Sequence, residues 1–102
     1  MAKRITILGS TGSIGQSTLD IVRNSLEGMF EVVALTANKN AKLLAEQAIE
    51  FNAKYVALSD SSNANILKEM LKGLDVKIGI GPESLIEAAS YKTDFCMAAI
   101  IG

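Results

Sequence analysis

Short apolar runs alternate along the chain with segments whose apolar residues recur at helical spacing. Five runs are predicted to be β-strands, at residues 4–8, 30–35, 54–58, 76–80 and 95–101. Four segments with helical spacing lie between them, at residues 13–24, 40–52, 63–72 and 82–90. No low-complexity stretch, linker or repeat interrupts this alternation. Residues 1–102 are therefore predicted to form a single α/β unit.

The predicted strands are expected to differ in how far their two faces are buried by other parts of the protein. Residues 30–35 are apolar almost without interruption, which is typical of a parallel strand packed on both faces. Residues 76–80 alternate between apolar and polar side chains, which predicts a half-exposed strand at the edge of the sheet. Because crossovers between parallel strands are right-handed, the order predicts a Rossmann-like, doubly wound, mostly parallel sheet of about five strands. Helices then cover both faces, and the last strand lies beside the first.

The second and third predicted helices carry apolar stripes that are expected to be buried. Asn40 is a candidate N-cap for the second helix, and Pro82 suits the first position of the fourth. The residues expected to face inward are Leu44, Ala48 and Phe51 on the second helix and Ile66, Leu67, Met70 and Leu71 on the third. Ile14, Leu19, Ile21 and Val22 recur at helical spacing in the first, which predicts the helix itself.

Three glycines at triplet spacing lie between the first strand and the first helix. Gly9 permits a sharp exit from the strand, Gly12 lets a ligand approach the backbone, and Gly15 allows close packing of the helix. The free amides of the first helical turn then form an anion site suited to a pyrophosphate. Further donors are the hydroxyls of Ser10, Thr11 and Ser13. A glycine-rich turn that serves only tight packing is the alternative, and the absence of Gly-Lys-Ser/Thr excludes a Walker P-loop.

The end of the second predicted strand bears on which dinucleotide would bind. Enzymes that use NAD place a carboxylate there, which accepts hydrogen bonds from the ribose 2′-hydroxyl. Residues 35–40 carry no carboxylate that would repel a 2′-phosphate. Lys39 could pair with such a phosphate, and Asn38 and Asn40 could donate hydrogen bonds to it. This end of the strand therefore favours NADP over NAD. The alternative is a solvated Lys39 and an Asn40 that only caps a helix. Asp60 is a candidate adenine neighbour, but a polar turn is the simpler account.

Composition removes several other classes of function. The net charge is −1, with 10 basic and 11 acidic residues, and the basic residues are scattered, which argues against a nucleic-acid partner. The chain has no histidine, so it offers no Ser-His-Asp triad and no imidazole ligand for zinc. Cys96 is its single cysteine, expected to be buried in the last strand, and this favours a reducing, cytoplasmic compartment. No apolar run approaches the roughly 20 residues of a membrane span.

The first strand and the glycine loop also carry a specific resemblance. Residues 5–15, I-T-I-L-G-S-T-G-S-I-G, followed by S-T-L-D at residues 17–20, closely resemble the start of the 1-deoxy-D-xylulose 5-phosphate reductoisomerase family. Further matches at residues 32–35, 39–40, 46–47, 50–51 and 97–102 extend the resemblance over the whole chain. The continuation at residues 17–20 disfavours another NADP-dependent oxidoreductase with a similar loop, such as aspartate-semialdehyde dehydrogenase.

That family uses NADPH and a divalent metal, manganese or magnesium, to convert 1-deoxy-D-xylulose 5-phosphate to 2-C-methyl-D-erythritol 4-phosphate in the non-mevalonate isoprenoid pathway. The resemblance implies that residues 11–14 hold the pyrophosphate and that Lys39 and Asn40 flank the 2′-phosphate. Asn38 departs from the glycine that is common in the family, and its side chain either adds a hydrogen bond or crowds the ribose. The expected cofactor-binding residues are Gly9, Ser10, Thr11, Gly12, Ser13, Ile14, Asn38, Lys39 and Asn40.

The resemblance also implies what the chain does not contain. The family's acidic metal ligands and substrate-phosphate binders lie in a later catalytic domain, so neither a catalytic residue nor a metal ligand is expected here. Residues 1–102 are then an incomplete N-terminal NADPH-binding domain, truncated after the fourth principal strand and inactive alone. A homo-oligomer is expected, through the family's dimer or through pairing of the apolar last strand. A standalone NADP-sensing module remains the alternative.

Overall fold

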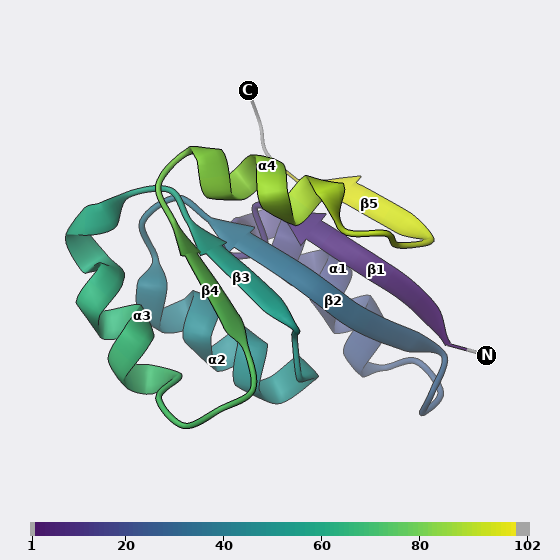
Figure 1. Ribbon diagram of the computed structural model, residues 1–102. Coiled ribbons are helices and arrows are strands. Elements are labelled where there is room, and N and C mark those ends of the chain that lie inside the picture. Colours follow the sequence, from purple (N-terminus) through teal and green to yellow (C-terminus); the bar gives the residue numbers. More distant parts are fainter. Residues whose placement is uncertain (1, 100–102) are drawn as a thin grey trace.

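Strands and helices alternate along the chain in the order that the hydrophobic pattern predicts (Figure 1). The computed structural model describes residues 2–99. The strands are β1 (Lys3–Leu8), β2 (Phe30–Ala37), β3 (Tyr55–Leu58), β4 (Lys77–Ile80) and β5 (Phe95–Ala98). The helices are α1 (Ser13–Arg23), α2 (Ala41–Phe51), α3 (Ala64–Met70) and α4 (Glu83–Ser90), and a 3-10 turn, η1 (Ser61–Asn63), precedes α3. The second strand extends two residues beyond its predicted end, and residues 100–101 of the last predicted strand lie outside the described residues.

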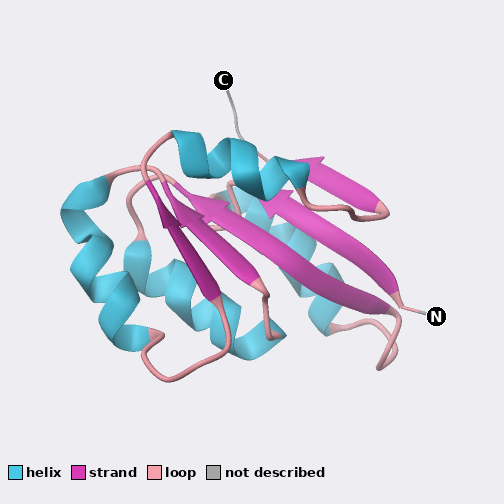
Figure 2. Ribbon diagram, viewed as in Figure 1, coloured by secondary structure: helices cyan, strands magenta, loops and turns pink. Residues whose placement is uncertain are grey.

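The strands of the described residues form a single parallel sheet in the order β4-β3-β2-β1-β5 (Figure 2). Ile5 of β1 lies beside Val32 of β2 on one side and Phe95 of β5 on the other. The last strand therefore lies beside the first, as predicted. β4 lies at the opposite edge and none of its residues is fully buried, which confirms the predicted half-exposed edge strand.

Helices cover both faces of the sheet, as predicted. The chain moves outward from β1 to β4 through three helices, α1, α2 and α3, which pack on one face (Figure 1). It then returns across the opposite face through α4 and enters β5. Right-handed crossovers require this change of face, because the direction of travel along the sheet reverses after β4. The two longest helices, α1 and α2, have 11 residues each.

The core has a larger part beneath α1, α2 and α3 and a smaller part beneath α4. The larger part contains fully buried aliphatic side chains from the sheet and from its helices, including Ile7, Leu35, Leu44 and Leu67. The smaller part is built around Tyr55, whose hydroxyl donates a hydrogen bond to the Ser84 carbonyl at 3.2 Å. The Tyr55 ring stacks on Tyr91 with ring centroids 5.2 Å apart. A smaller, partly aromatic core is sufficient here because a single helix covers this face.

The predicted first helix is confirmed, but only two of the four apolar residues that predicted it face the core. Leu19 is buried and Val22 packs against the core, but Ile14 and Ile21 are 49% and 67% exposed. The buried line of this helix begins with Gly15, which continues the spacing of Leu19 and Val22 toward the N-terminus. Because glycine has no side chain to mark that line, the apolar spacing of residues 14–22 does not show where the line begins.

The second helix faces the core as predicted, and the third does so with one exception. Leu44 and Ala48 are buried and Phe51 packs at the margin of the core. On α3 the stripe consists of Leu67, Met70 and Leu71, whereas Ile66 is about half exposed. A seven-residue helix presents only a narrow line to its neighbour, so a fourth apolar residue falls on the solvent side.

The prediction that Cys96 is buried is also wrong. Every residue of β5 is exposed, including Cys96 and the neighbouring Phe95 and Met97. The reason is the position of β5 at the edge of the sheet, where an apolar strand has only β1 as a partner among the described strands. Within residues 2–99, no helix is both long enough and apolar enough to cross a membrane.

Candidate functional site

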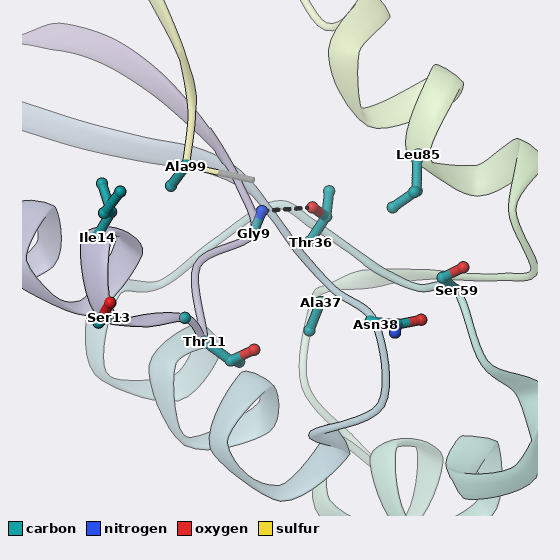
Figure 3. Close-up of a pocket in the computed structure, with 11 residues that line it drawn as sticks. Gly9, Thr11, Ser13, Ile14, Thr36, Ala37, Asn38, Ser59, Leu85 and Ala99 are labelled. Carbon is teal, nitrogen blue, oxygen red and sulfur yellow. Dashed lines mark hydrogen bonds between the residues drawn. The ribbon is translucent and has the colours of Figure 1, made fainter. Parts of the chain in front are cut away.

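The glycine loop connects β1 to α1 at the carboxyl edge of the sheet. Gly9 has a φ of +83°, a left-handed conformation that glycine adopts without strain, and the chain turns sharply out of the strand there. Its amide donates to Thr36 Oγ1 at 2.9 Å (Figure 3). The amide of Ser10 donates to the Thr36 carbonyl at 2.8 Å. The loop is thus attached to the end of β2, which fixes where its remaining groups point.

Gly15 is required by the packing of α1 against this loop. A Cβ added at Gly15 would lie 2.4 Å from the Gly9 carbonyl oxygen and 2.5 Å from Ser10 Cα. Both are backbone atoms, which cannot move aside as the end of a flexible side chain can. The expectation that Gly15 allows close packing is confirmed, and the contact is made to the loop at the end of β1.

Gly12 has no comparable requirement within the protein itself. A Cβ there would have only ordinary contact with the Gly9 carbonyl oxygen at 3.6 Å, and the φ of −76° suits any residue. Gly12 nevertheless lines a cleft and forms the N-cap of α1. The structure is consistent with a glycine that leaves room for a ligand.

The start of α1 offers unpaired backbone amides to this cleft. Its N-cap residue is Gly12, which has no side chain to cap the helix. The amide of Gly12 bonds to the Gly9 carbonyl, but those of Ser13 and Ile14 find no acceptor among the described residues. Exposed amides at the positive end of a helix dipole favour an anion. The arrangement is therefore suited to a phosphate group.

The cleft has a volume of about 450 Å³ and lies where the order of the strands reverses, between β1 and β5. Parallel sheets bind nucleotides at this type of position, beyond the carboxyl ends of the strands. Figure 3 shows side chains around the cleft from the glycine loop, from the loop after β2 and from α4. Its lining residues are Gly9, Thr11, Gly12, Ser13, Ile14, Thr36, Ala37, Asn38, Ser59, Leu85 and Ala99.

Six predicted site residues line this cleft, but Ser10 does not. The Ser10 side chain is completely buried, and its hydroxyl donates to Gln47 Oε1 at 2.7 Å. The expectation that this hydroxyl is a further donor to a pyrophosphate is therefore corrected: its proton is used inside the protein. Thr11 and Ser13 keep their places at the cleft.

The loop after β2 brings Asn38, Lys39 and Asn40 to the same edge of the sheet. Asn38 lines the cleft, while Lys39 and Asn40 follow it and are exposed. Asn40 Oδ1 accepts a hydrogen bond from the amide of Leu43 at 3.2 Å, so the predicted cap of α2 is confirmed. The Lys39 side chain makes no ion pair with the described residues. The backbone carbonyl of Lys39 accepts a hydrogen bond from Asn63 Nδ2 at 3.0 Å.

Asp60 behaves as the residue of a polar turn. Its carboxylate accepts from the amide of Ser62 at 2.9 Å and from the hydroxyl of Ser62 at 2.6 Å. These hydrogen bonds, with a smaller contribution from the charge of Lys39, lower the pKa of Asp60. Its amide also donates to the Asn38 carbonyl at 2.8 Å, so the turn after β3 supports the loop after β2.

Sequence reasoning missed five of the lining residues, which are Thr36, Ala37, Ser59, Leu85 and Ala99. Four of them lie at or just beyond the carboxyl ends of β2, β3 and β5, so an accurate strand boundary would have identified them. Leu85 lies on α4 and reaches the cleft only because that helix crosses the sheet (Figure 3). No group of three His, Cys, Asp or Glu residues within residues 2–99 is arranged to hold a metal ion.

Comparison with known proteins assigns the chain to a family. The family model described as 1-deoxy-D-xylulose 5-phosphate reductoisomerase matches residues 5–102. The chain belongs to this family. The reductoisomerase of Zymomonas mobilis is 48% identical over 100 residues, which is 98% of this chain and 26% of the relative. That of Nitrobacter winogradskyi is 46% identical over 100 residues, which is 98% of this chain and 24% of the relative. The chain spans about a quarter of the length of the curated relatives it matches.

Solved structures of the reductoisomerase family share the fold. The Zymomonas mobilis reductoisomerase in complex with NADPH matches with a TM-score of 0.93 and 47% identity, over 100% of this chain and 27% of that structure. A reductoisomerase in complex with NADPH, fosmidomycin and magnesium matches with a TM-score of 0.88 and 37% identity, over 98% of this chain and 25% of that structure. The predicted Rossmann-like α/β fold is confirmed.

Proposed function

We propose that this chain binds NADPH in the cleft beyond the carboxyl ends of β1, β2 and β5. The observation that carries the proposal is the pair of amides of Ser13 and Ile14 at the start of α1, which find no acceptor within residues 2–99 and follow a loop that is itself bonded to the end of β2. These groups fit a pyrophosphate, because they supply donors and a positive dipole without a side chain at Gly12. The relative in complex with NADPH supports the same cofactor.

The loop after β2 distinguishes the proposed cofactor from NADH. Lys39 supplies a positive charge and Asn38 a side-chain amide, and Asn40 is held beside them by its cap on α2. No carboxylate lies among residues 35–40 to repel a 2′-phosphate. Asp60 is in backbone contact with this loop, and its carboxylate accepts hydrogen bonds from Ser62 within its own turn. This arrangement favours NADPH.

The proposed role within a longer enzyme follows from the family. There, NADPH would supply the hydride for the conversion of 1-deoxy-D-xylulose 5-phosphate to 2-C-methyl-D-erythritol 4-phosphate, with manganese or magnesium held by residues outside this chain. The chain alone would bind the cofactor without turning over substrate, since it spans about a quarter of its relatives. The further expectations of a cytoplasmic location and of no nucleic-acid partner rest on the single cysteine and the scattered basic residues.

Thermal unfolding with each cofactor tests the proposal. NADPH at a concentration well above its dissociation constant should raise the melting temperature, and NADH at the same concentration should raise it less, because a ligand that binds only the folded state stabilises it. Lys39→Ala should remove most of this difference. Lys42→Ala is the matched control, because Lys42 is exposed on α2 and does not line the cleft.

Two results would contradict the proposed function. Equal shifts with NADPH and NADH, or none with either, would refute the cofactor assignment. Oxidation of NADPH by the chain alone, with 1-deoxy-D-xylulose 5-phosphate and manganese present, would refute the proposal that the chain only binds the cofactor.

A further inference from the structure

Gln47 is an exceptional residue on α2, because it is a polar side chain within the buried face of the helix. It is only 5% exposed, and its neighbours Leu44 and Ala48 belong to the core. Burying an amide without hydrogen bonds is costly, so its partners show what it does. Both of its hydrogen bonds are made with Ser10 of the glycine loop, 37 residues away in the sequence.

The Gln47 side chain and Ser10 make two reciprocal hydrogen bonds. Gln47 Nε2 donates to the Ser10 carbonyl at 2.9 Å, and Gln47 Oε1 accepts from Ser10 Oγ at 2.7 Å. The carbonyl of Ser10 can only accept, which determines the orientation of the amide and requires the hydroxyl to donate. Since Ser10 is also completely buried, water does not compete for either bond.

These bonds connect the glycine loop to the middle of α2, the helix that follows the other loop of the proposed NADPH site. Ser10 lies between Gly9 and the free amides at the start of α1, and α2 begins directly after Lys39 and Asn40. Gln47 therefore holds the pyrophosphate side of the site at a defined distance from the 2′-phosphate side. The Thr36 bonds to Gly9 and Ser10 secure the loop to β2, but they do not reach α2.

We propose that Gln47 is a positioning residue, which aligns the glycine loop with the N-terminus of α2 so that one dinucleotide contacts both. The inference rests on the proposed binding of NADPH. A ligand that bridges both loops gains affinity when their spacing is established before it binds. A ligand that contacts only the loop after β2 gains nothing from this spacing.

The experiment compares two ligands on the same variants. NADPH reaches both loops, whereas adenosine 2′-monophosphate carries only the 2′-phosphate side. Dissociation constants are measured by titration calorimetry at a temperature where circular dichroism shows each variant to be folded. Gln47→Leu should weaken NADPH about tenfold and adenosine 2′-monophosphate less than about twofold. A purely structural role would weaken both ligands equally or neither.

Further variants keep the test decisive if Gln47→Leu does not fold. Ser10→Ala removes the bond to Gln47 Oε1 and a longer bond from the same hydroxyl to the Thr36 carbonyl at 3.3 Å, but it leaves the bond from Gln47 Nε2. It should therefore produce a smaller loss of the same ligand selectivity. Tyr55→Phe is the matched control, because it removes a buried hydrogen bond beneath α4, on the opposite face of the sheet. It should leave both dissociation constants within about twofold.

The results distinguish a failure of the positioning role from a failure of the proposed function. If the unaltered chain binds NADPH and the folded Gln47 and Ser10 variants bind it equally well, or lose both ligands in parallel, the positioning role is refuted while the proposed function stands. If the unaltered chain does not bind NADPH, the proposed function is refuted, and the inference with it.

Discussion

The three glycines of the loop have three different physical requirements. Gly9 adopts a positive φ, Gly15 leaves no room for a Cβ, and Gly12 is constrained by neither. Only the requirement at Gly12 points to something outside the chain. Single substitutions should therefore separate the folding role of this loop from its binding role.

We predict opposite behaviour for alanine at two of these positions. Gly15→Ala forces a Cβ against the backbone of Gly9 and Ser10 and should lower the free energy of unfolding by about 2 kcal/mol. Gly12→Ala should change it by less than about 1 kcal/mol, because the φ and the space both allow alanine. It should nevertheless weaken NADPH binding. Urea unfolding and NADPH titration measure the two effects, and a Gly12→Ala chain with unchanged affinity would contradict the reserved space.

At the scale of elements, α2 organises the site from one end to the other. Asn40 caps its N-terminus beside the 2′-phosphate side, and Gln47 holds the glycine loop from the middle of the helix. Near its C-terminus Glu50 pairs with Arg23 of α1, with Arg23 Nη2 and Glu50 Oε1 2.9 Å apart. The guanidinium also lies over the ring of Phe51. Both loops that line the cleft thus depend on where this helix lies.

Asn40 allows capping to be separated from binding. Asn40→Ala removes the acceptor for the Leu43 amide and should lower the free energy of unfolding by about 1 kcal/mol. Asn40→Asp retains an acceptor and should preserve stability, yet it places a carboxylate beside a 2′-phosphate. Its affinity for NADPH should therefore fall, while its affinity for NADH changes little. Unchanged NADPH affinity in Asn40→Asp would show that Asn40 only caps the helix.

The ion pair between α1 and α2 predicts a dependence of stability on pH. The hydrogen bond from Arg23 lowers the pKa of Glu50 below its ordinary value. A carboxyl group whose pKa is lower in the folded state stabilises the fold at pH values above its unfolded pKa, which for glutamate is roughly 4.3. This stabilisation is lost as the pH falls through the pKa of the folded state.

Urea unfolding at pH 7 and pH 3 tests this dependence. Glu50→Gln should be less stable than the unaltered chain at pH 7, by below about 1 kcal/mol because the pair is partly exposed, and nearly equal to it at pH 3. Glu46→Gln is the control, because Glu46 makes no ion pair within residues 2–99. A Glu50→Gln deficit that persists unchanged at pH 3 would contradict the sign of the linkage.

At the scale of the molecule, the reversal of strand order creates both the cleft and an exposed apolar edge. The cleft lies at the carboxyl ends of β1 and β5, and β5 is also the outermost described strand on that side (Figure 2). Phe95 and Met97 of this strand are 48% and 41% exposed. An apolar strand with an unpaired edge tends to associate with another chain.

We therefore predict that the chain self-associates through β5. Its sedimentation coefficient should rise with concentration, and Phe95→Lys or Met97→Lys should reduce that rise, because lysine opposes edge pairing. Ile86→Lys is the matched control, since Ile86 is also a large exposed apolar residue but lies on α4. A strictly monomeric chain at high concentration would contradict the prediction, as would an equal effect of Ile86→Lys.

The local pattern was sufficient for the order of elements, the parallel sheet and the glycine loop. Alternation, helical spacing and glycine placement depend on neighbours within a few residues, and these neighbours are present in the sequence itself. The same holds for Asn40, whose cap is formed with a residue three positions away. The glycine loop could be recognised for this reason, and its residues 11–14 line the cleft.

Other features required the folded chain. Ser10 faces Gln47 rather than the cleft, Leu85 reaches the cleft from α4, and Cys96 is exposed on an edge strand. Each depends on contacts between residues far apart in the sequence, which periodicity does not record. At Gly15 the sequence predicted close packing of the helix, but only the structure shows that the packing is against the backbone of Gly9 and Ser10 and that the buried line of α1 begins there.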